Sequence, residues 1–192
     1  MFHQAEVQPE PRTSPVPPCR ELADFCADIG RVLAAAGEDD APALIARMLP
    51  ALLANPDLLR EEHRKVPGGC AYGRHTLFQC PRDRFTVLAM VWPAGVVSPV
   101  HDHLTWCAFG VYEGTLRETR FQPQPGGTAE RPLARLTETF IRRPGDTSSL
   151  PLTAPDIHAM SNPTGQAVFS IHVYGGNAAT QGPNLRRVYA PA

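Results

Sequence analysis

The hydrophobic pattern near the N-terminus has the period of helices. Over 20–36 the apolar residues recur with helical spacing, and a second stretch of this kind covers 41–54, with Asp40 as a candidate cap. Asn55-Pro56 marks the start of a short third helix over 55–64. We therefore expect three helices that pack on a core and carry no chemistry.

After Val66-Pro67-Gly68-Gly69 the period shortens to that of strands. Short apolar runs bounded by Gly, Pro, Asp and Asn recur at 74–79, 85–92, 106–112, 115–121, 133–142 and 167–174. Glu113-Gly114 is a hairpin signal, and 122–132 is a loop rich in Pro and Gly. Many short strands without interleaved helices predict an antiparallel all-β sandwich or barrel.

Length, charge and cysteine content narrow the class of protein. The chain of 192 residues has the length of one domain, which we expect over 20–192, with helices over 20–66 and a β-barrel over 70–180. The segment 1–19 is rich in proline, and we expect it to be a disordered leader. A net charge of -1 disfavours nucleic acid as a partner, and no apolar run is long enough to span a membrane. Five cysteines without a CxxC spacing disfavour a disulfide framework and favour a reducing cytoplasm. Monomer and small homo-oligomer both stay open.

Three histidines are the strongest candidates for chemistry. On a strand, His101 and His103 would project from one face roughly 6.6 Å apart, because strands rise about 3.3 Å per residue and alternate faces. His158, on a neighbouring strand-like segment, can supply a third ligand to the same metal ion. No carboxylate stands where a fourth ligand is expected.

The spacing around these histidines resembles the two cupin motifs. The first has Gly95, His101-x-His103 and Gly114, and the second has Gly145, Pro151, His158 and Asn162. The second departs by two extra residues before the histidine and by Thr153 where a glycine is usual. The resemblance covers about 72–174 and implies a cupin fold, a double-stranded β-helix or jelly-roll barrel, here with an α-helical N-terminal segment.

Further residues resemble the cysteine dioxygenase, or thiol dioxygenase, family within the cupins. Cys107 stands where many cupins have a metal-binding glutamate, which leaves a three-histidine site and implies iron(II). His101–Cys107 and Gly114–Phe121 resemble the core of that family. Ser170, His172 and Tyr174 resemble its Ser-His-Tyr set, and the segment from Tyr72 through Arg74 resembles its Tyr-x-Arg-Asn segment, whose arginine holds the substrate carboxylate.

Two of these groups also have ordinary structural interpretations. Ser170, His172 and Tyr174 share one strand face, so they either point inward and hydrogen-bond one another or form a solvated outer face. Arg74 is either a surface salt-bridge residue or a fork that binds a carboxylate, with Tyr72 as its support.

Cys107 is either a small buried hydrophobe or the partner of Tyr174 in a thioether, as in animal cysteine dioxygenases. Its short spacing from His103, with Trp106, is similar to bacterial mercaptopropionate dioxygenases. The chain thus combines features of two subgroups and is identified as a bacterial-type member. We expect Trp92 and Trp106 to pack near the barrel rim or pocket.

The resemblance implies a thiol dioxygenase that binds Fe(II) and adds both atoms of O2 to a small thiol acid to give a sulfinic acid. L-cysteine is the first choice of substrate, with 3-mercaptopropionate and mercaptosuccinate as alternatives. A non-catalytic metal-binding cupin and a zinc or nickel cupin enzyme are the alternatives from other classes, because histidine sites accept several metals.

Overall fold

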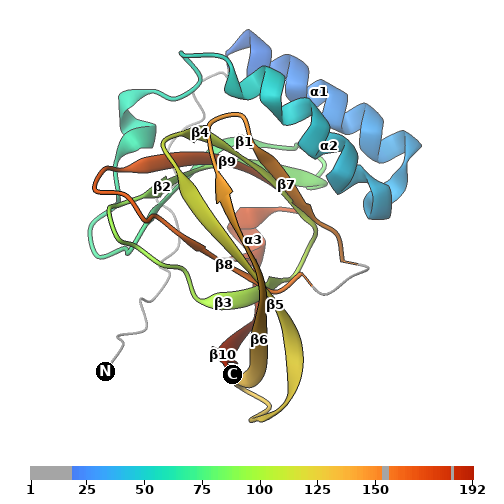
Figure 1. Cartoon of the computed structure of the whole chain (residues 1–192). Helices are drawn as coiled ribbons and strands as arrows, with labels where there is room; N and C mark the ends of the chain where they lie inside the picture. The colour runs from blue at the N-terminus through green and yellow to red at the C-terminus, as the bar shows by residue number, and fades with distance from the viewer. Residues whose placement is uncertain (1–18, 153–155, 183) are drawn as a thin grey trace.

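The protein is a β-barrel with two α-helices stacked on one side and a long hairpin projecting away from them (Figure 1). The computed structural model describes residues 19–152, 156–182 and 184–192. Of the predicted leader only Cys19 lies within the described residues. Within these ranges, none of the helices is both long and apolar enough to cross a membrane.

The two helices follow the predicted pattern with one correction at the start of the second. Helix α1, Arg20–Ala35, lies where the sequence predicts it, whereas α2, Gly37–Leu53, begins earlier than predicted. Gly37 has a φ of 73°, a conformation that glycine adopts without strain, and it turns the chain directly from one helix into the next. Asp40 therefore lies within the acidic first turn of α2, and its prediction as the cap is wrong.

The predicted third helix over 55–64 is also wrong. Only a short 3-10 helix, η1, forms there, at Glu61–Arg64. The side chain of Asn55 accepts a hydrogen bond from the backbone N–H of Asp57 at 2.9 Å. A bond of this kind gives the backbone a turn as an alternative to a helix, and Pro56 has no N–H to donate.

One sheet lies beneath the helices. Its strand order is β1-β2-β9-β4-β7, and the central strands β2 and β9 are buried along their whole length. The bounds are β1 Gly73–Gln79, β2 Phe85–Trp92, β4 Cys107–Glu113, β7 Thr147–Leu150 and β9 Val168–Gly175. Strand β7 carries no apolar run, and the sequence did not predict it.

The second sheet closes on itself through a parallel pairing of β10 with β6, in the order β10-β3-β8-β5-β6. Its strands are β3 Val100–His103, β5 Leu116–Gly127, β6 Pro132–Arg142, β8 His158–Ser161 and β10 Leu185–Pro191. The prediction of a loop over 122–132 is wrong, because β5 and β6 continue as a hairpin to a turn at 128–131. A register shift and two glycines at positive φ, Gly126 and Gly127, let the strand pass through this Gly-rich segment. Strand β10 and the short helix α3, Ala178–Gln181, were not predicted.

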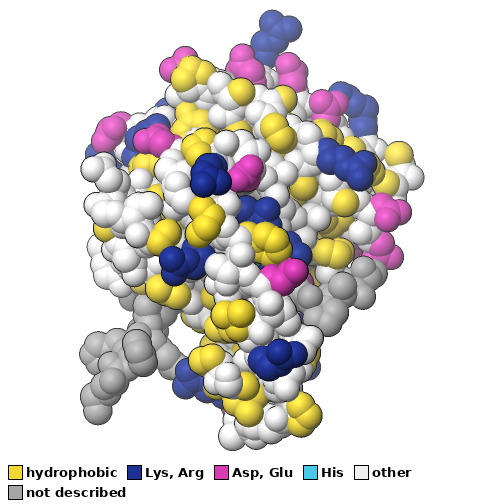
Figure 2. Space-filling model, in the orientation of Figure 1, with side chains coloured by type: hydrophobic (Ala, Val, Ile, Leu, Met, Phe, Trp, Pro, Cys, Tyr) yellow, Lys and Arg dark blue, Asp and Glu magenta, His cyan; other side chains and the backbone are white. Residues whose placement is uncertain are grey.

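Alternation along β9 separates two cores. Phe169, Ile171 and Val173 pack beneath the helices, whereas Val168 and Tyr174 belong to the cluster inside the barrel. This arrangement confirms the predicted fold class, a double-stranded β-helix barrel with a helical N-terminal segment. Figure 2 shows charged side chains of both signs scattered over the visible face rather than one continuous patch of either sign.

Candidate metal centre

The three histidines come together inside the barrel from two paired strands. His101 and His103 lie on β3, and His158 on β8 is the antiparallel partner of His101. One nitrogen from each ring can be chosen so that all lie within 4.8 Å of one another. The exposed fractions of the three residues are only 7%, 1% and 2%, so the rings are largely shielded from bulk solvent.

Two of the three rings are held from behind through Nδ1. His101 Nδ1 lies 2.9 Å from the carbonyl oxygen of Pro99, and His103 Nδ1 lies 2.8 Å from Oδ2 of Asp156. A carbonyl and a carboxylate only accept hydrogen bonds, so Nδ1 carries the proton in both rings. The Nε2 lone pairs of His101 and His103 are therefore free to bind a metal.

The charge state of the rings suits the same use. Burial, followed by the neighbouring His158 and His103, holds the pKa of His101 well below its usual value. Burial also lowers the pKa of His158. A histidine binds a metal ion through the unprotonated nitrogen of its neutral ring. Neutral imidazoles clustered in a buried site therefore fit a divalent metal ion. The residues present thus fit the metal that the sequence predicts.

A buried carboxylate, Glu118 on β5, stands behind the third ligand. Its Oε1 lies 3.7 Å from His158 Nδ1, too far for a hydrogen bond, and that nitrogen has no other partner within the described residues. Burial would raise the pKa of Glu118, but His158, Arg120 and Arg142 bring it down to about 2. The Glu118 carboxylate is therefore charged, and Arg142 holds Oε2 through two bonds of 2.6 and 2.9 Å.

Neither Glu118 nor Asp156 belongs to the metal-binding group itself. Among the described residues the group consists of the three histidines alone. Sequence reasoning missed both carboxylates. Asp156 stands two residues before His158, and Glu118 stands two residues after the buried Leu116. Residues two apart on a strand point to the same face, and this alternation was the signal that could have placed both carboxylates inside the barrel.

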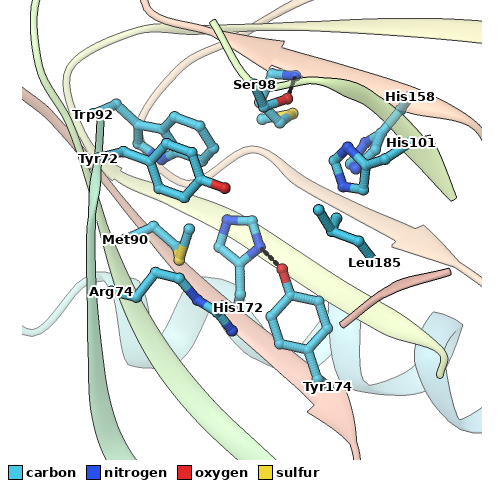
Figure 3. A pocket seen from close by; sticks show the side chains of 11 residues that line it. Tyr72, Arg74, Met90, Trp92, Ser98, His101, His158, His172, Tyr174 and Leu185 are labelled. Carbon is cyan, nitrogen blue, oxygen red and sulfur yellow. Dashed lines mark hydrogen bonds between the residues drawn. The ribbon is translucent and has the colours of Figure 1, made fainter. Parts of the chain in front are cut away.

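The predicted residues Arg74 and Tyr72 share one small cavity with His101 and His158 (Figure 3). Its walls are Tyr72, Arg74, Met90, Trp92, Ser98, His101, His158, Met160, His172, Tyr174 and Leu185. Within the described residues Arg74 makes no ion pair, and its hydrogen bond is a long 3.5 Å contact to the carbonyl of Gly182. The structure thus brings an unpaired guanidinium to the cavity that also contains two of the histidines.

The Ser170, His172 and Tyr174 side chains form a hydrogen-bonded row on the inner face of β9. Ser170 Oγ lies 2.9 Å from His172 Nε2, and His172 Nδ1 lies 3.1 Å from the Tyr174 hydroxyl. The exposed fractions of the three side chains do not exceed 8%. The alternative of a solvated outer face is therefore wrong.

Cys107 is fully buried on β4, and its cross-strand partner on β9 is Tyr174. Burial raises the pKa of the Cys107 thiol and that of the Tyr174 hydroxyl well above their usual values, so both groups keep their protons. All five cysteines are free, which agrees with the expectation drawn from their number and spacing.

The two tryptophans differ in position. Trp92 lines the cavity, as predicted, whereas Trp106 lies in the core beneath the helices and not in the cavity wall. Thr153, the position where the second cupin motif departs from glycine, lies outside the described residues.

No protein-family model matches the chain. Among solved structures it is similar to the Cupin_2 domain of an XRE family transcriptional regulator from Enterobacter cloacae, at 18% identity over 54% of this chain and 95% of that one, with a TM-score of 0.38. A cupin 2 conserved barrel domain protein from Salinispora arenicola gives 17% identity over 64% and 89%, with a TM-score of 0.44. An oxalate oxidase in complex with the substrate analogue glycolate gives 16% over 48% and 42%, with a TM-score of 0.38. Likenesses at this level indicate neither a metal nor a substrate for this chain.

Proposed function

We propose that the protein is an iron(II)-dependent thiol dioxygenase that converts a small thiol acid, L-cysteine first, into its sulfinic acid. The observation that carries this proposal is the cavity itself. Two members of a three-histidine group without a carboxylate ligand, His101 and His158, line it together with Tyr174 and with Arg74, which makes no ion pair within the described residues. The resemblance of these residues to the thiol dioxygenases supplies the reaction, in which R–SH and O2 give R–SO2H.

Arg74 is the residue we assign to the substrate carboxylate. A guanidinium presents paired N–H donors that match both oxygens of a carboxylate. Tyr72 stands beside it, stacked on Trp92 with ring centroids 5.2 Å apart, and this stack keeps the wall next to the guanidinium rigid. Binding of the carboxylate at Arg74 would fix the distance between the substrate thiol and the histidines.

Iron(II) held by His101, His103 and His158 would supply the redox chemistry and lower the pKa of the substrate thiol. The chain supplies the surroundings. Met90, Met160 and Leu185 line the cavity with apolar groups, which exclude water from the reacting sulfur. Tyr174 keeps its proton in this setting and can donate a hydrogen bond to the substrate.

Oxygen consumption by the iron-loaded protein tests this proposal. We would measure it with L-cysteine, 3-mercaptopropionate, mercaptosuccinate and cysteamine, and measure sulfinate formed in the same samples. Thiols with a carboxylate should be consumed with equal amounts of oxygen, and cysteamine, which has no carboxylate, should react poorly. Absence of oxygen consumption with the whole panel would refute the proposal and favour a metal-binding cupin of another kind.

A further inference from the structure

The hydrogen-bonded row on β9 continues one residue further, onto β2. The indole Nε1 of Trp92 donates to Ser170 Oγ at 2.8 Å, and the row then runs through His172 to Tyr174. Trp92 was predicted only as a packing residue, and the Ser-His-Tyr resemblance does not include it. Because Trp92 begins the row, its hydrogen bond determines which group donates in each of the later bonds.

An indole N–H can only donate, so the first bond has a fixed direction. Ser170 Oγ accepts that proton, and within the described residues its other partner is His172 Nε2. The serine hydroxyl proton is then available for this second bond. Donation by Ser170 to Nε2 satisfies both groups, whereas a proton on Nε2 would occupy the second lone pair of the serine oxygen and leave the buried serine proton without an acceptor within the described residues.

The direction passes on to the tyrosine. Because Nε2 of His172 accepts, the neutral ring carries its proton on Nδ1 and donates it to the Tyr174 oxygen. Burial, together with the neighbouring His158, His103 and Arg74, holds the pKa of His172 well below its usual value and keeps the ring neutral. The Tyr174 oxygen then accepts from His172, so the tyrosine's own proton is left to be donated to a group other than His172.

Packing prevents the rings from turning away from this arrangement. Phe109 stacks on His172 with ring centroids 5.1 Å apart and planes 14° apart. Trp92 is held by its stack with Tyr72, which lines the same cavity. In Figure 3 the Tyr174 hydroxyl is bonded to the His172 ring, within the side chains that surround the cavity.

We propose that Trp92 is a positioning residue whose indole N–H fixes the tautomer of His172 and thereby leaves the Tyr174 proton free to be donated to a group other than His172. The assignment of the tautomer does not depend on the reaction. The use of the Tyr174 proton in catalysis rests on the proposed function.

The tautomer can be read directly by long-range proton–nitrogen NMR of the full chain labelled with nitrogen-15 in histidine. Zinc, which is diamagnetic, would replace iron, and His172→Gln would identify the resonances. We expect wild-type His172 to show a protonated Nδ1 and an unprotonated Nε2 as a single form. In Trp92→Phe the serine loses its obligatory donor, so the Nε2–H form should appear alongside the first.

Trp106→Phe is the matched control, because Trp106 is also buried and its Nε1 has no hydrogen-bond partner within the described residues. It should leave the His172 signals unchanged. A wild-type ring protonated on Nε2, or a Trp92→Phe spectrum identical to that of the wild type, would overturn the proposal. Should Trp92→Phe not fold, Ser170→Ala interrupts the same row and should give the same mixture; a single Nδ1–H form there would overturn it equally.

Kinetics separate this inference from the proposed function. With a thiol acid that the wild type oxidises, Trp92→Phe should lower kcat by about tenfold and leave KM unchanged, since one neutral hydrogen bond is at stake and Arg74 still binds the carboxylate. If no thiol acid reacts but the tautomer follows Trp92, the proposed function fails and the positioning role stands. If thiols react but the His172 tautomer is the same with and without Trp92, the proposed function stands and the positioning role of Trp92 fails.

Discussion

The strands β3, β8 and β5 on one side of the cavity and β2 and β9 on the other support it with different kinds of polar group. On the β3–β8–β5 side, buried charges stand behind the histidines: Asp156 holds His103, and Glu118, bound by Arg142, faces His158. On the β2–β9 side, the row from Trp92 to Tyr174 contains only neutral groups. A metal ion is stabilised by negative charge behind its ligands, whereas the direction of a hydrogen-bonded row is fixed by a group that can only donate, as the Trp92 indole does. The difference indicates that one side holds the metal and the other directs a proton.

The largest effect should come from removing a metal ligand on the β3–β8–β5 side of the cavity, which we call the charged side because Asp156 and Glu118 lie there. His158→Ala leaves two histidines and should abolish stoichiometric iron binding, because two imidazoles alone do not close the site. Metal content measured by mass spectrometry after dialysis checks this. His75→Ala is the control, since His75 bonds the Lys65 carbonyl away from the cavity. Equal iron content in His158→Ala and the wild type would remove His158 from the site.

Glu118→Ala should be the most destabilising change to the support behind the ligands. It leaves Arg142 and Arg120 without their buried partner, and breaking a buried ion pair costs about 3–5 kcal/mol of unfolding free energy. Urea unfolding measures the loss. Glu113→Ala removes an exposed partner of Arg64 instead and should cost no more than about 1 kcal/mol. Similar losses in the two variants would show that the Glu118 cluster is no more than a surface pair.

Asp156→Asn keeps the shape of the side chain but removes the charge behind His103. Loss of such a partner typically costs about 10–100-fold in metal affinity. Competition with a chelator measures the change, and Asp146→Asn, in an exposed turn, serves as control. An unchanged affinity in Asp156→Asn would contradict the role that we assign to the charged side.

Arg74→Ala tests where the substrate carboxylate binds. Losing charge-assisted hydrogen bonds worth about 1.5–3 kcal/mol should raise KM for thiol acids roughly 10–100-fold. Turnover of cysteamine, however slow, should not change, because it has no carboxylate. A KM for L-cysteine equal to that of the wild type would place the carboxylate elsewhere.

The smallest change concerns Cys107 and Tyr174, which face each other across β4 and β9. A thioether between them, formed with dioxygen as the oxidant, would lower the mass of the intact protein by two hydrogen atoms. Tyr174→Phe and Cys107→Ser should each have their full sequence mass. Full sequence mass in iron-loaded, oxygen-exposed wild-type protein would show that Cys107 is only a buried thiol.

The sequence predicted the parts of the protein that depend on local pattern. The strand β2 follows from a continuous apolar run, and the histidine pair on β3 follows from a spacing of two residues. It missed β10, whose Leu185–Pro191 segment alternates little in hydrophobicity yet pairs with both β3 and β6 to close the barrel. Closure depends on contacts between segments far apart in the chain, which a local pattern does not contain.

The same division holds in the candidate site. The histidines could be placed from the sequence because two share a strand, whereas Glu118 meets His158 only through the register of β5 against β8, in which Arg120 lies opposite His158. Likewise Trp92 meets Ser170 because β2 and β9 pair with Met90 opposite Ser170. A shift of one residue in either register would turn these side chains to the other face of the sheet.

Reaction under oxygen-18-labelled dioxygen tests the central claim most directly. Iron-loaded protein would be incubated with L-cysteine, or with the thiol acid that reacts fastest, and the product analysed by mass spectrometry. The proposed function predicts a sulfinic acid in which both oxygen atoms on sulfur carry the label. A product with label at one position or none, or a disulfide in place of a sulfinic acid, would contradict it.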